Sequence, residues 1–428
     1  MFYLHILKTK LIVVLAFFFI GILPAFGEPT ITDPDFIVKK FVSDIAGSPT
    51  TMAFVEDDIL VLQKEDGKVR LIKDGVLQEK PILDVEVNSS GERGLLGITT
   101  VGSTVYLYFT ESTRDGSEPI GNRIYRYDWN GQELVNQILV KELPSTNYYH
   151  NGGAMVTGLD GAVYAVIGDT GTYGVLQNHP SGGINDTSVI LRVAPEGPYY
   201  AMGIRNSFGL AIDPVNGNLW ATENGPDDFD EINLVAPNFN SGWDVIMGPT
   251  TEAELSTLPG YDGYTYSDPE FSWEQVVAPT ALSFVDSNEF EKYKNSLFVA
   301  DCIFGNLYKF ELNSNRDGFV FDDPSLADKV VNRDDTMQEI GFGTGFGCIT
   351  DLEIGPDGFL YVISLSEGTI YRIMPKTEMI NNPEIIDSEE SFRFAEYLII
   401  AALIAVALIV FKVRKKNVTP SQTKTTQP

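Results

Sequence analysis

Histidine is scarce in this chain, and the position of one histidine suggests acid–base chemistry. The sequence contains three histidines, of which His5 falls in the N-terminal apolar segment, leaving His150 and His179. His150 is followed by an asparagine and two glycines, which allow a tight loop. If Asp169, after a predicted strand, reaches the same face of the fold, its carboxylate would fix the imidazole tautomer and raise the basicity of the other nitrogen. The pair is a candidate general base, although Gly-Asp-Thr-Gly is also ordinary turn sequence, in which Asp169 only caps the backbone.

A second candidate loop presents a cation beside an amide. Arg205 and Asn206 lie between Gly203 and Gly209. A guanidinium held on a tight loop suits a carboxylate or a developing oxyanion. The alternative is a surface charge ahead of an apolar strand.

Five acidic residues within nine positions surround a Gly-Pro turn: Glu223, Asp227, Asp228, Asp230 and Glu231. Carboxylates and carbonyls are the ligands that hard cations such as calcium prefer. The spacing is not that of an EF-hand loop, so a solvated acidic surface is the alternative interpretation.

Short apolar strand runs recur along the chain and predict the elements that hold these loops. They lie at residues 59–61, 105–107, 163–165, 219–221, 297–299 and 360–362. Most follow a turn signal, and several are succeeded by a glycine and a second strand, a pattern typical of hairpins. Six copies spaced 46 to 78 residues apart predict an all-β fold, a six-bladed β-propeller over residues 30–375 with functional loops around a central channel. A pair of β-sandwiches is the alternative.

Both ends of the chain carry apolar segments, and their flanking residues differ. Residues 1–27 have lysines before a short apolar run and small residues after it, which is typical of a signal peptide. An uncleaved anchor helix is the alternative for this segment. Residues 394–413 form a longer apolar run followed by basic residues, which predicts one transmembrane helix with residues 414–428 in the cytoplasm. Residues 376–393 are an acidic stalk, so we expect a propeller on the extracytoplasmic side of a cell membrane.

The charge of the chain argues against one class of partner. The formal net charge is −29, with the basic excess confined to the predicted membrane ends. Binding to nucleic acid depends on lysine and arginine neutralising phosphates, so we expect no nucleic-acid partner.

Several sequence runs, in this order, resemble the glucose/sorbosone dehydrogenase family. The matching runs are residues 91–97, 150–153, 167–169, 205–206, 224–234 and 241–243. The resemblance covers about residues 40–375 and rests on the joint match of motifs that are each weak alone. It implies a six-bladed propeller that oxidises aldose sugars with pyrroloquinoline quinone (PQQ) and calcium.

The resemblance also implies catalytic roles. His150 would take the proton from the anomeric hydroxyl of the sugar while hydride passes to the quinone, and Asp169 would orient His150. Arg205 would polarise a quinone oxygen, with Asn206 beside it on the cofactor. A base, an electrophile and a planar acceptor are the groups that such a hydride transfer requires.

Two calcium positions are implied as well. The carbonyls of Gly225 and Pro226 would hold a catalytic calcium against the cofactor. Glu231 and the backbone of Ser241 match a second, structural calcium position.

The chain departs from the family at the cations that bind the carboxylates of the quinone. The lysine position is Ile303, and the two arginine positions fall near Cys348 and Thr350. Losing three charge-assisted contacts, each worth about 1.5–3 kcal/mol, would weaken the binding of a tricarboxylate severely.

A further departure changes a neutral residue to an acid. The glutamine of the second-blade loop is Glu92 here, which adds an adverse charge. Arg93 and Arg123 are the candidates to compensate for it.

The two cysteines, Cys302 and Cys348, fall in the segments that lost the cations. A pair in an oxidising compartment permits one disulfide. We expect it to join blades five and six on the floor of the pocket, closing a loop of about 45 residues and contributing about 3–4 kcal/mol. A stapling disulfide with no bearing on the site is the alternative.

Two functional hypotheses follow. The first is a membrane-tethered quinoprotein sugar dehydrogenase, with a sugar substrate and an extracytoplasmic electron acceptor. The second is a propeller that has lost the quinone and acts as a ligand-binding or surface-interaction module. Hydrogen-bond contact between His150 and Asp169 would favour the enzyme, and burial of His150 under packed loops would weigh against it.

Overall fold

The computed structural model describes residues 28–171, 177–179 and 182–381. The predicted signal peptide, transmembrane helix and cytoplasmic tail lie outside these residues, as does most of the predicted stalk. The chain divides into two compact units, residues 1–374 and 375–428. Within the described part of the second unit, α3 (Lys376–Asn381) is the regular element. In the residues that the structure describes, no helix is long and apolar enough to cross a membrane.

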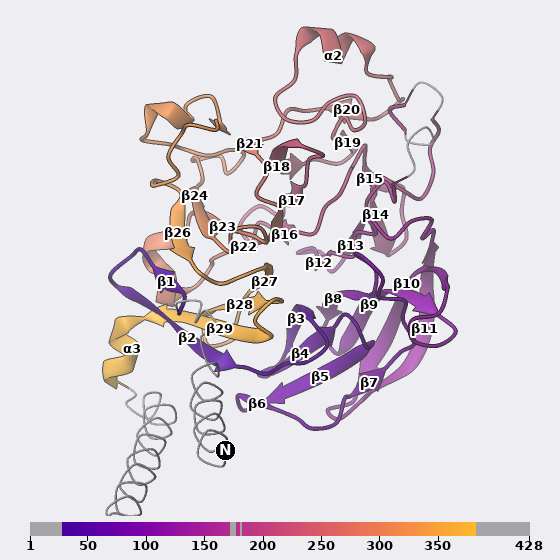
Figure 1. Ribbon diagram of the computed structural model, residues 1–428, viewed down its shortest axis with the longest axis vertical. Helices are drawn as coiled ribbons and strands as arrows, with labels where there is room; N and C mark the ends of the chain where they lie inside the picture. The colour runs from indigo at the N-terminus through magenta and orange to yellow at the C-terminus, as the bar shows by residue number, and fades with distance from the viewer. Residues whose placement is uncertain (1–27, 172–176, 180–181, 382–428) are drawn as a thin grey trace, which may run out of the picture. The chain divides into compact units, whose positions relative to one another are not determined.

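Among the described residues, the strands of the first unit form six sheets, and three of these sheets begin in its first half (Figure 1). The first sheet contains β3 (Pro49–Val55), β4 (Asp58–Gln63), β5 (Lys68–Lys73), β6 (Val76–Leu77) and β7 (Leu83–Asp84). The second contains β8 (Leu95–Val101), β9 (Thr104–Ser112), β10 (Pro119–Trp129) and β11 (Leu134–Leu143). The third contains β12 (Met155–Thr157), β13 (Val163–Ile167), β14 (Val189–Ala194), β15 (Tyr199–Met202), β19 (Phe239–Asn240) and β20 (Thr265–Tyr266).

The remaining three sheets come from the second half of the unit, with two strands added from its beginning. The fourth contains β16 (Leu210–Ile212), β17 (Leu219–Glu223), β18 (Asp228–Val235), β21 (Phe271–Gln275) and β25 (Val330–Val331). The fifth contains β22 (Pro279–Phe284), β23 (Ser296–Asp301), β24 (Leu307–Glu311), β26 (Gly341–Thr344) and β1 (Thr30–Ile31). The sixth contains β27 (Ile349–Ile354), β28 (Leu360–Ser364), β29 (Thr369–Pro375) and β2 (Phe36–Val42).

The first strands of the six sheets contact one another in a closed order: β3, β8, β12, β16, β22, β27 and again β3. Residues from all six strands line one central cavity of about 300 Å³. The structure therefore confirms the all-β, propeller-like arrangement predicted from the repeated strand runs. It does not form the alternative pair of sandwiches, because each sheet has a neighbour on both sides.

Apolar side chains fill the interfaces between neighbouring sheets. Each of six buried clusters joins two adjacent sheets, so the clusters follow the ring around. Between the fourth and fifth sheets, the rings of Phe271 and Phe310 meet edge-on with centroids 4.8 Å apart. Most sheets are covered on both faces by neighbouring sheets. The sequences of their strands are therefore nearly continuous apolar runs, as in β4 and β23.

The N-terminal strands complete the last two sheets of the ring. In β1, Thr30 pairs with Thr344 and Ile31 pairs with Gly343 of β26. Strand β2 lies beside β29 at the outer edge of the sixth sheet (Figure 1). The ring is therefore closed by hydrogen bonds between segments from opposite ends of the unit.

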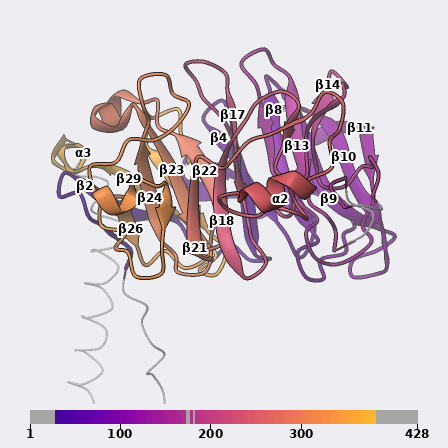
Figure 2. The same ribbon diagram turned by 90° about the horizontal axis from the view of Figure 1, so that it is seen from above.

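Helices are few and short in the described part of the first unit. The 3₁₀ helices η1 (Asn288–Tyr293) and η2 (Pro324–Leu326) lie in connections between strands. Helix α2 (Glu252–Thr257) buries none of its residues and lies at the periphery, outside the sheets (Figures 1 and 2). A capping box between Thr251 and Glu254 stabilises its first turn.

Two carboxyl groups of β27 line the central cavity. Asp351 accepts hydrogen bonds from the backbone N–H groups of Met52 at 2.7 Å and Leu352 at 2.9 Å. Burial raises the pKa of Asp351 to about 7. Burial also raises the pKa of Glu353 well above its usual value, and the nearby charge of Asp351 adds to this effect.

These carboxyl groups are expected to make stability fall as pH rises from about 4 to about 7. In the unfolded chain they ionise near their ordinary pKa values of about 4, whereas the folded chain retains their protons to higher pH. Over this interval the unfolded state releases protons that the folded state keeps, so the free energy of unfolding decreases. Urea unfolding at a series of pH values should show this slope, and Asp351→Asn should flatten it. The control Asp57→Asn, at an exposed turn, should keep the slope; an equal slope in Asp351→Asn would contradict the assignment.

Candidate functional site

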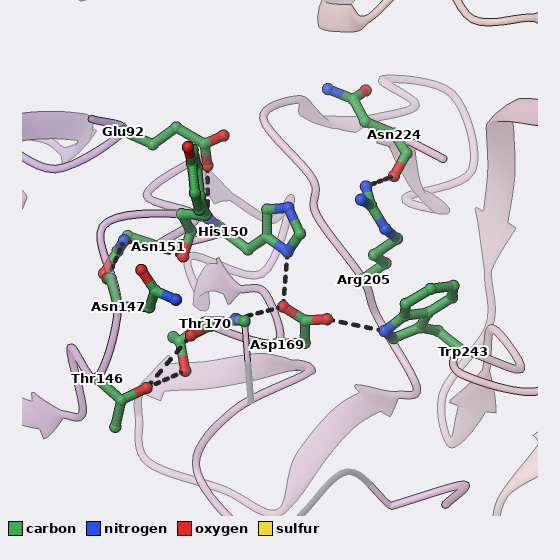
Figure 3. A network of polar contacts seen from close by, with 12 residues as sticks. Glu92, Thr146, Asn147, His150, Asn151, Asp169, Thr170, Arg205, Asn224 and Trp243 are labelled. Carbon is green, nitrogen blue, oxygen red and sulfur yellow. Dashed lines mark hydrogen bonds and ion pairs between the residues drawn. The ribbon is translucent and has the colours of Figure 1, made fainter. Parts of the chain in front are cut away.

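His150 and Asp169 meet in hydrogen-bond contact. His150 lies in the loop between β11 and β12, and Asp169 follows the end of β13. The imidazole Nδ1 and the carboxylate Oδ1 are 2.6 Å apart (Figure 3). The side chain of His150 keeps 14% of its surface exposed, so it is partly buried and not fully covered by the surrounding loops. With Nδ1 on the carboxylate, Nε2 is the nitrogen left to accept a proton.

The local backbone brings these two loops and the Arg205 loop together at one glycine. A Cβ on Gly168 would lie 2.4 Å from the carbonyl oxygen of Arg205 and 2.8 Å from that of His150. The N–H of Asp169 donates to the same Arg205 carbonyl at 2.9 Å. His150 itself has φ +57°, a left-handed conformation that few non-glycine residues adopt. The Gly-Asp motif is thus the point where three site residues converge.

Asp169 is fully buried and holds its charge through hydrogen bonds. Its Oδ2 accepts from the indole N–H of Trp243 at 2.9 Å, and Oδ1 also accepts from the N–H of Gly171 at 2.7 Å. Burial alone would raise the pKa of Asp169, but the hydrogen bonds and the charge of His150 hold it below its usual value. The residue is therefore a carboxylate at neutral pH and can stabilise an imidazolium.

Glu92 fixes the His150 loop rather than only adding an adverse charge. Its Oε2 accepts from the backbone N–H of His150 at 2.5 Å (Figure 3). The N–H of Glu92 donates in turn to the carbonyl of Tyr148 at 2.8 Å. Burial raises the pKa of Glu92, and the hydrogen bond from His150 opposes this rise. An acid at this position thus positions the candidate base.

Arg205 is held by contacts at both its backbone and its guanidinium group. Its N–H donates to Oε1 of Glu223 at 2.6 Å. Nη1 donates to the carbonyls of Asn224 at 2.6 Å and Gly225 at 3.0 Å. The guanidinium lies 5.2 Å from the centre of the Trp243 ring, in the geometry of a cation–π contact. Trp243 therefore contacts both Asp169 and Arg205, a bridging role that the sequence indicated only through its Ser-Gly-Trp run.

A cavity of about 470 Å³ adjoins these residues. It is lined by residues from several sheets, among them Lys64, Glu92, Asn206, Asn224, Thr350 and both cysteines. Three buried polar atoms around it have no hydrogen-bond partner among the described residues: Nε of Arg205, Oδ1 of Asn206 and Oδ1 of Asn224. Buried polar groups are normally satisfied, so these atoms leave unused hydrogen-bonding capacity near the cavity.

Cys302 and Cys348 form the predicted disulfide, with their Cα atoms 3.8 Å apart. Cys302 follows β23 of the fifth sheet and Cys348 precedes β27 of the sixth, so the bond joins these two sheets as expected. Both residues line the cavity. The disulfide is therefore part of the wall of the candidate site.

The positions that lost the family's cations provide no positive charge to the cavity. Ile303 is 54% exposed, and the hydroxyl of Thr350 donates to the carbonyl of Pro49 at 3.4 Å. Neither arginine considered as a substitute lines the cavity: Arg93 donates to Ser145, and Arg123 forms ion pairs on the second sheet. The cavity-lining cation is instead Lys64, which sequence reasoning missed because it lies in a different sheet.

The turn predicted for a catalytic calcium is occupied by other contacts. The carbonyl of Gly225 accepts from Nη1 of Arg205 at 3.0 Å, and Pro226 is exposed. The guanidinium thus takes the place where a cation would bind this carbonyl. This hydrogen bond uses one of the two lone pairs of the carbonyl oxygen, and a calcium ion at this turn stays a prediction.

The second predicted calcium position holds a pair of buried acids. Glu231 lies opposite Glu223 in the β17–β18 pair, and the hydroxyl of Ser241 donates to Glu223 at 2.6 Å. Oε1 of Glu231 accepts from the N–H of Gly248 at 2.5 Å and Oε2 from Asn233 at 2.9 Å. Burial raises the pKa of Glu223 to about 7 and that of Glu231 well above its usual value. Across the described residues, no group of three or more His, Cys, Asp or Glu could hold a metal ion, so calcium stays a prediction.

Comparisons with known proteins give this site a family context. The family model for glucose/sorbosone dehydrogenases matches residues 46–372. Aldose sugar dehydrogenase YliI of Escherichia coli is 22% identical over 369 residues, covering 80% of this chain and 94% of that protein.

Solved structures agree in fold. The crystal structure of the soluble aldose sugar dehydrogenase of Escherichia coli in its apo form has a TM-score of 0.64 at 20% identity, covering 80% of this chain and 100% of that one. The PQQ-bound aldose sugar dehydrogenase of Streptomyces coelicolor has a TM-score of 0.57 at 23% identity, covering 80% of this chain and 99% of that one.

Proposed function

The chain belongs to the glucose/sorbosone dehydrogenase family, and from this premise we propose that it oxidises the anomeric hydroxyl of an aldose sugar by hydride transfer to PQQ. The observation that carries the proposal is the 2.6 Å contact between His150 and Asp169 beside a cavity with unsatisfied polar atoms. The names of the relatives support a sugar oxidoreductase in general.

The residues around the cavity fit a planar polar cofactor. Asn206 and Asn224, which line the cavity, would hold the quinone through their side-chain amides, and the quinone would accept the hydride when bound.

His150 acts as the general base in this proposal. Its Nε2 takes the proton of the anomeric hydroxyl, and Asp169 stabilises the imidazolium that results. Trp243 and Gly171 keep Asp169 ionised, and Glu92 fixes the backbone of His150, so the imidazole is positioned before substrate binds. Arg205, anchored by two carbonyls, stabilises negative charge beside the base.

The cellular setting is also a proposal. The signal-peptide and transmembrane patterns at residues 1–27 and 394–413 favour an extracytoplasmic enzyme tethered to the cell membrane. Such an enzyme would pass electrons to an extracytoplasmic acceptor.

The absence of cations at Ile303, Cys348 and Thr350 favours a second candidate function. A propeller without this cradle could bind another ligand in the same cavity, or serve as a surface-interaction module. In that case His150 would contact the ligand without proton transfer.

The purified full-length chain, incubated with PQQ with and without calcium, should bind the quinone and oxidise aldoses in a dye-linked assay. Binding measured by equilibrium dialysis and turnover on a panel of aldoses check the two parts separately. The 1-deoxy analogue of each active sugar, which lacks the anomeric hydroxyl, should be inert. Absence of quinone binding at high micromolar concentration would favour the second candidate function.

A further inference from the structure

Lys64 is a cation in the cavity that the proposed mechanism does not use. It follows β4 in the first sheet and is one of the residues that line the cavity of about 470 Å³. None of the other described residues that line this cavity is a lysine or an arginine, whereas Glu65 and Glu92 are acids. An anion entering the cavity would therefore find its positive charge at Lys64.

The position of Lys64 is built by contacts with the neighbouring sheet. Its N–H donates to the carbonyl of Ser48 at 3.0 Å, and its carbonyl accepts from the N–H of Leu95 at 3.1 Å. A Cβ on Gly94 would lie 2.4 Å from the carbonyl oxygen of Lys64 and 2.7 Å from its Cγ. Gly94, with φ +135°, thus allows the lysine stem to pack against the loop that carries Glu92.

The ammonium group retains capacity for a ligand. Nζ donates to the carbonyl of Ser89 at 3.1 Å, which uses one of its three hydrogens. No carboxylate of the described residues lies within 4.0 Å of it, in contrast to Lys68, which pairs with Asp66 at 2.8 Å. Partial burial lowers the pKa of Lys64, and the charges of Glu65 and Glu92 only partly oppose this. A bound anion would restore the interactions that burial removes.

We propose that Lys64 binds a carboxylate of the quinone cofactor and replaces, from the first sheet, the cations that the fifth and sixth sheets lack. This inference rests on the proposed function. It assigns the cofactor's anionic edge to the side of the cavity formed by Lys64.

The test is PQQ binding to the full-length chain, measured by equilibrium dialysis without substrate. Lys64→Gln should weaken binding about 10- to 100-fold, the range expected for one charge-assisted contact, and Lys64→Arg should recover part of the loss. The trimethyl ester of PQQ, which lacks the negative charges, should bind Lys64→Gln and the unaltered chain with equal affinity. If Lys64 had a purely structural role, Lys64→Gln would lower the affinity for PQQ and for its trimethyl ester alike.

Lys68→Gln is the matched control, because Lys68 lies near the same turn but pairs with Asp66 and does not line the cavity. It should bind PQQ as the unaltered chain does. Equal PQQ affinity in Lys64→Gln and the unaltered chain would overturn the role of Lys64 and leave the proposed function intact. Failure of the unaltered chain to bind PQQ would overturn both.

Discussion

Replacing His150 by alanine is expected to lower kcat about a hundred- to ten-thousand-fold while PQQ affinity stays nearly unchanged. The imidazole is the group placed to take the proton, whereas Asn206, Asn224 and Lys64 face the cofactor cavity. Steady-state oxidation of the best aldose, together with equilibrium dialysis of the quinone, separates the two effects.

Two further variants sharpen this result. Asp169→Asn should also lower kcat, because an amide cannot stabilise the imidazolium and allows the wrong tautomer. His179→Ala, which removes the other histidine of the described chain, should leave turnover within a few-fold of the original. If His150→Ala retained turnover within a few-fold, another base would have to be sought and the proposed mechanism would be wrong.

Loss of the Cys302–Cys348 disulfide is expected to lower the free energy of unfolding by about 4 kcal/mol. The bond links residues 46 positions apart, and cross-linking a loop of this length removes that much conformational entropy from the unfolded chain in the usual model. The double variant Cys302→Ser/Cys348→Ser should therefore unfold at clearly lower urea concentration than the oxidised chain.

Reductant provides the control for this comparison. It should shift the unfolding midpoint of the unaltered chain toward that of the double variant and leave the double variant unchanged. Equal midpoints for the oxidised chain and the double variant would show that the bond adds no stability. PQQ binding by a folded double variant would also separate the two roles of the disulfide. Weaker binding than in the oxidised chain would show that the bond shapes the cavity, and equal binding would show that it only stabilises the fold.

The repeated architecture could be predicted from the sequence because most of its information is local. The three innermost strands of each sheet pair antiparallel, so apolar runs and turn residues mark them directly. The contact between His150 and Asp169 was also predictable, since both residues belong to the third repeat. The disulfide followed from the presence of only two cysteines.

The contacts between sheets could not be predicted in the same way. Glu92 looked like an adverse charge because its partner, the N–H of His150, lies 58 positions away on another sheet. The sequence did not indicate Lys64, because the family resemblance implies cations in the fifth and sixth sheets and Lys64 follows a strand of the first; the close approach of Gly94 to Lys64 is visible only in the structure. The sequence also does not indicate that Arg205 contacts the Gly225 carbonyl, one of the groups predicted to bind calcium.

The pairing of β1 and β2 with the last two sheets has a consequence for biosynthesis. Thr30 pairs with Thr344, so a chain emerging from the ribosome cannot close its ring until almost the whole unit has been made. Contacts of such long sequence separation form slowly, and until it pairs with β2 the outer edge of β29 is open to other chains. A version truncated before Val42 would keep that edge exposed permanently and would be prone to self-association through it.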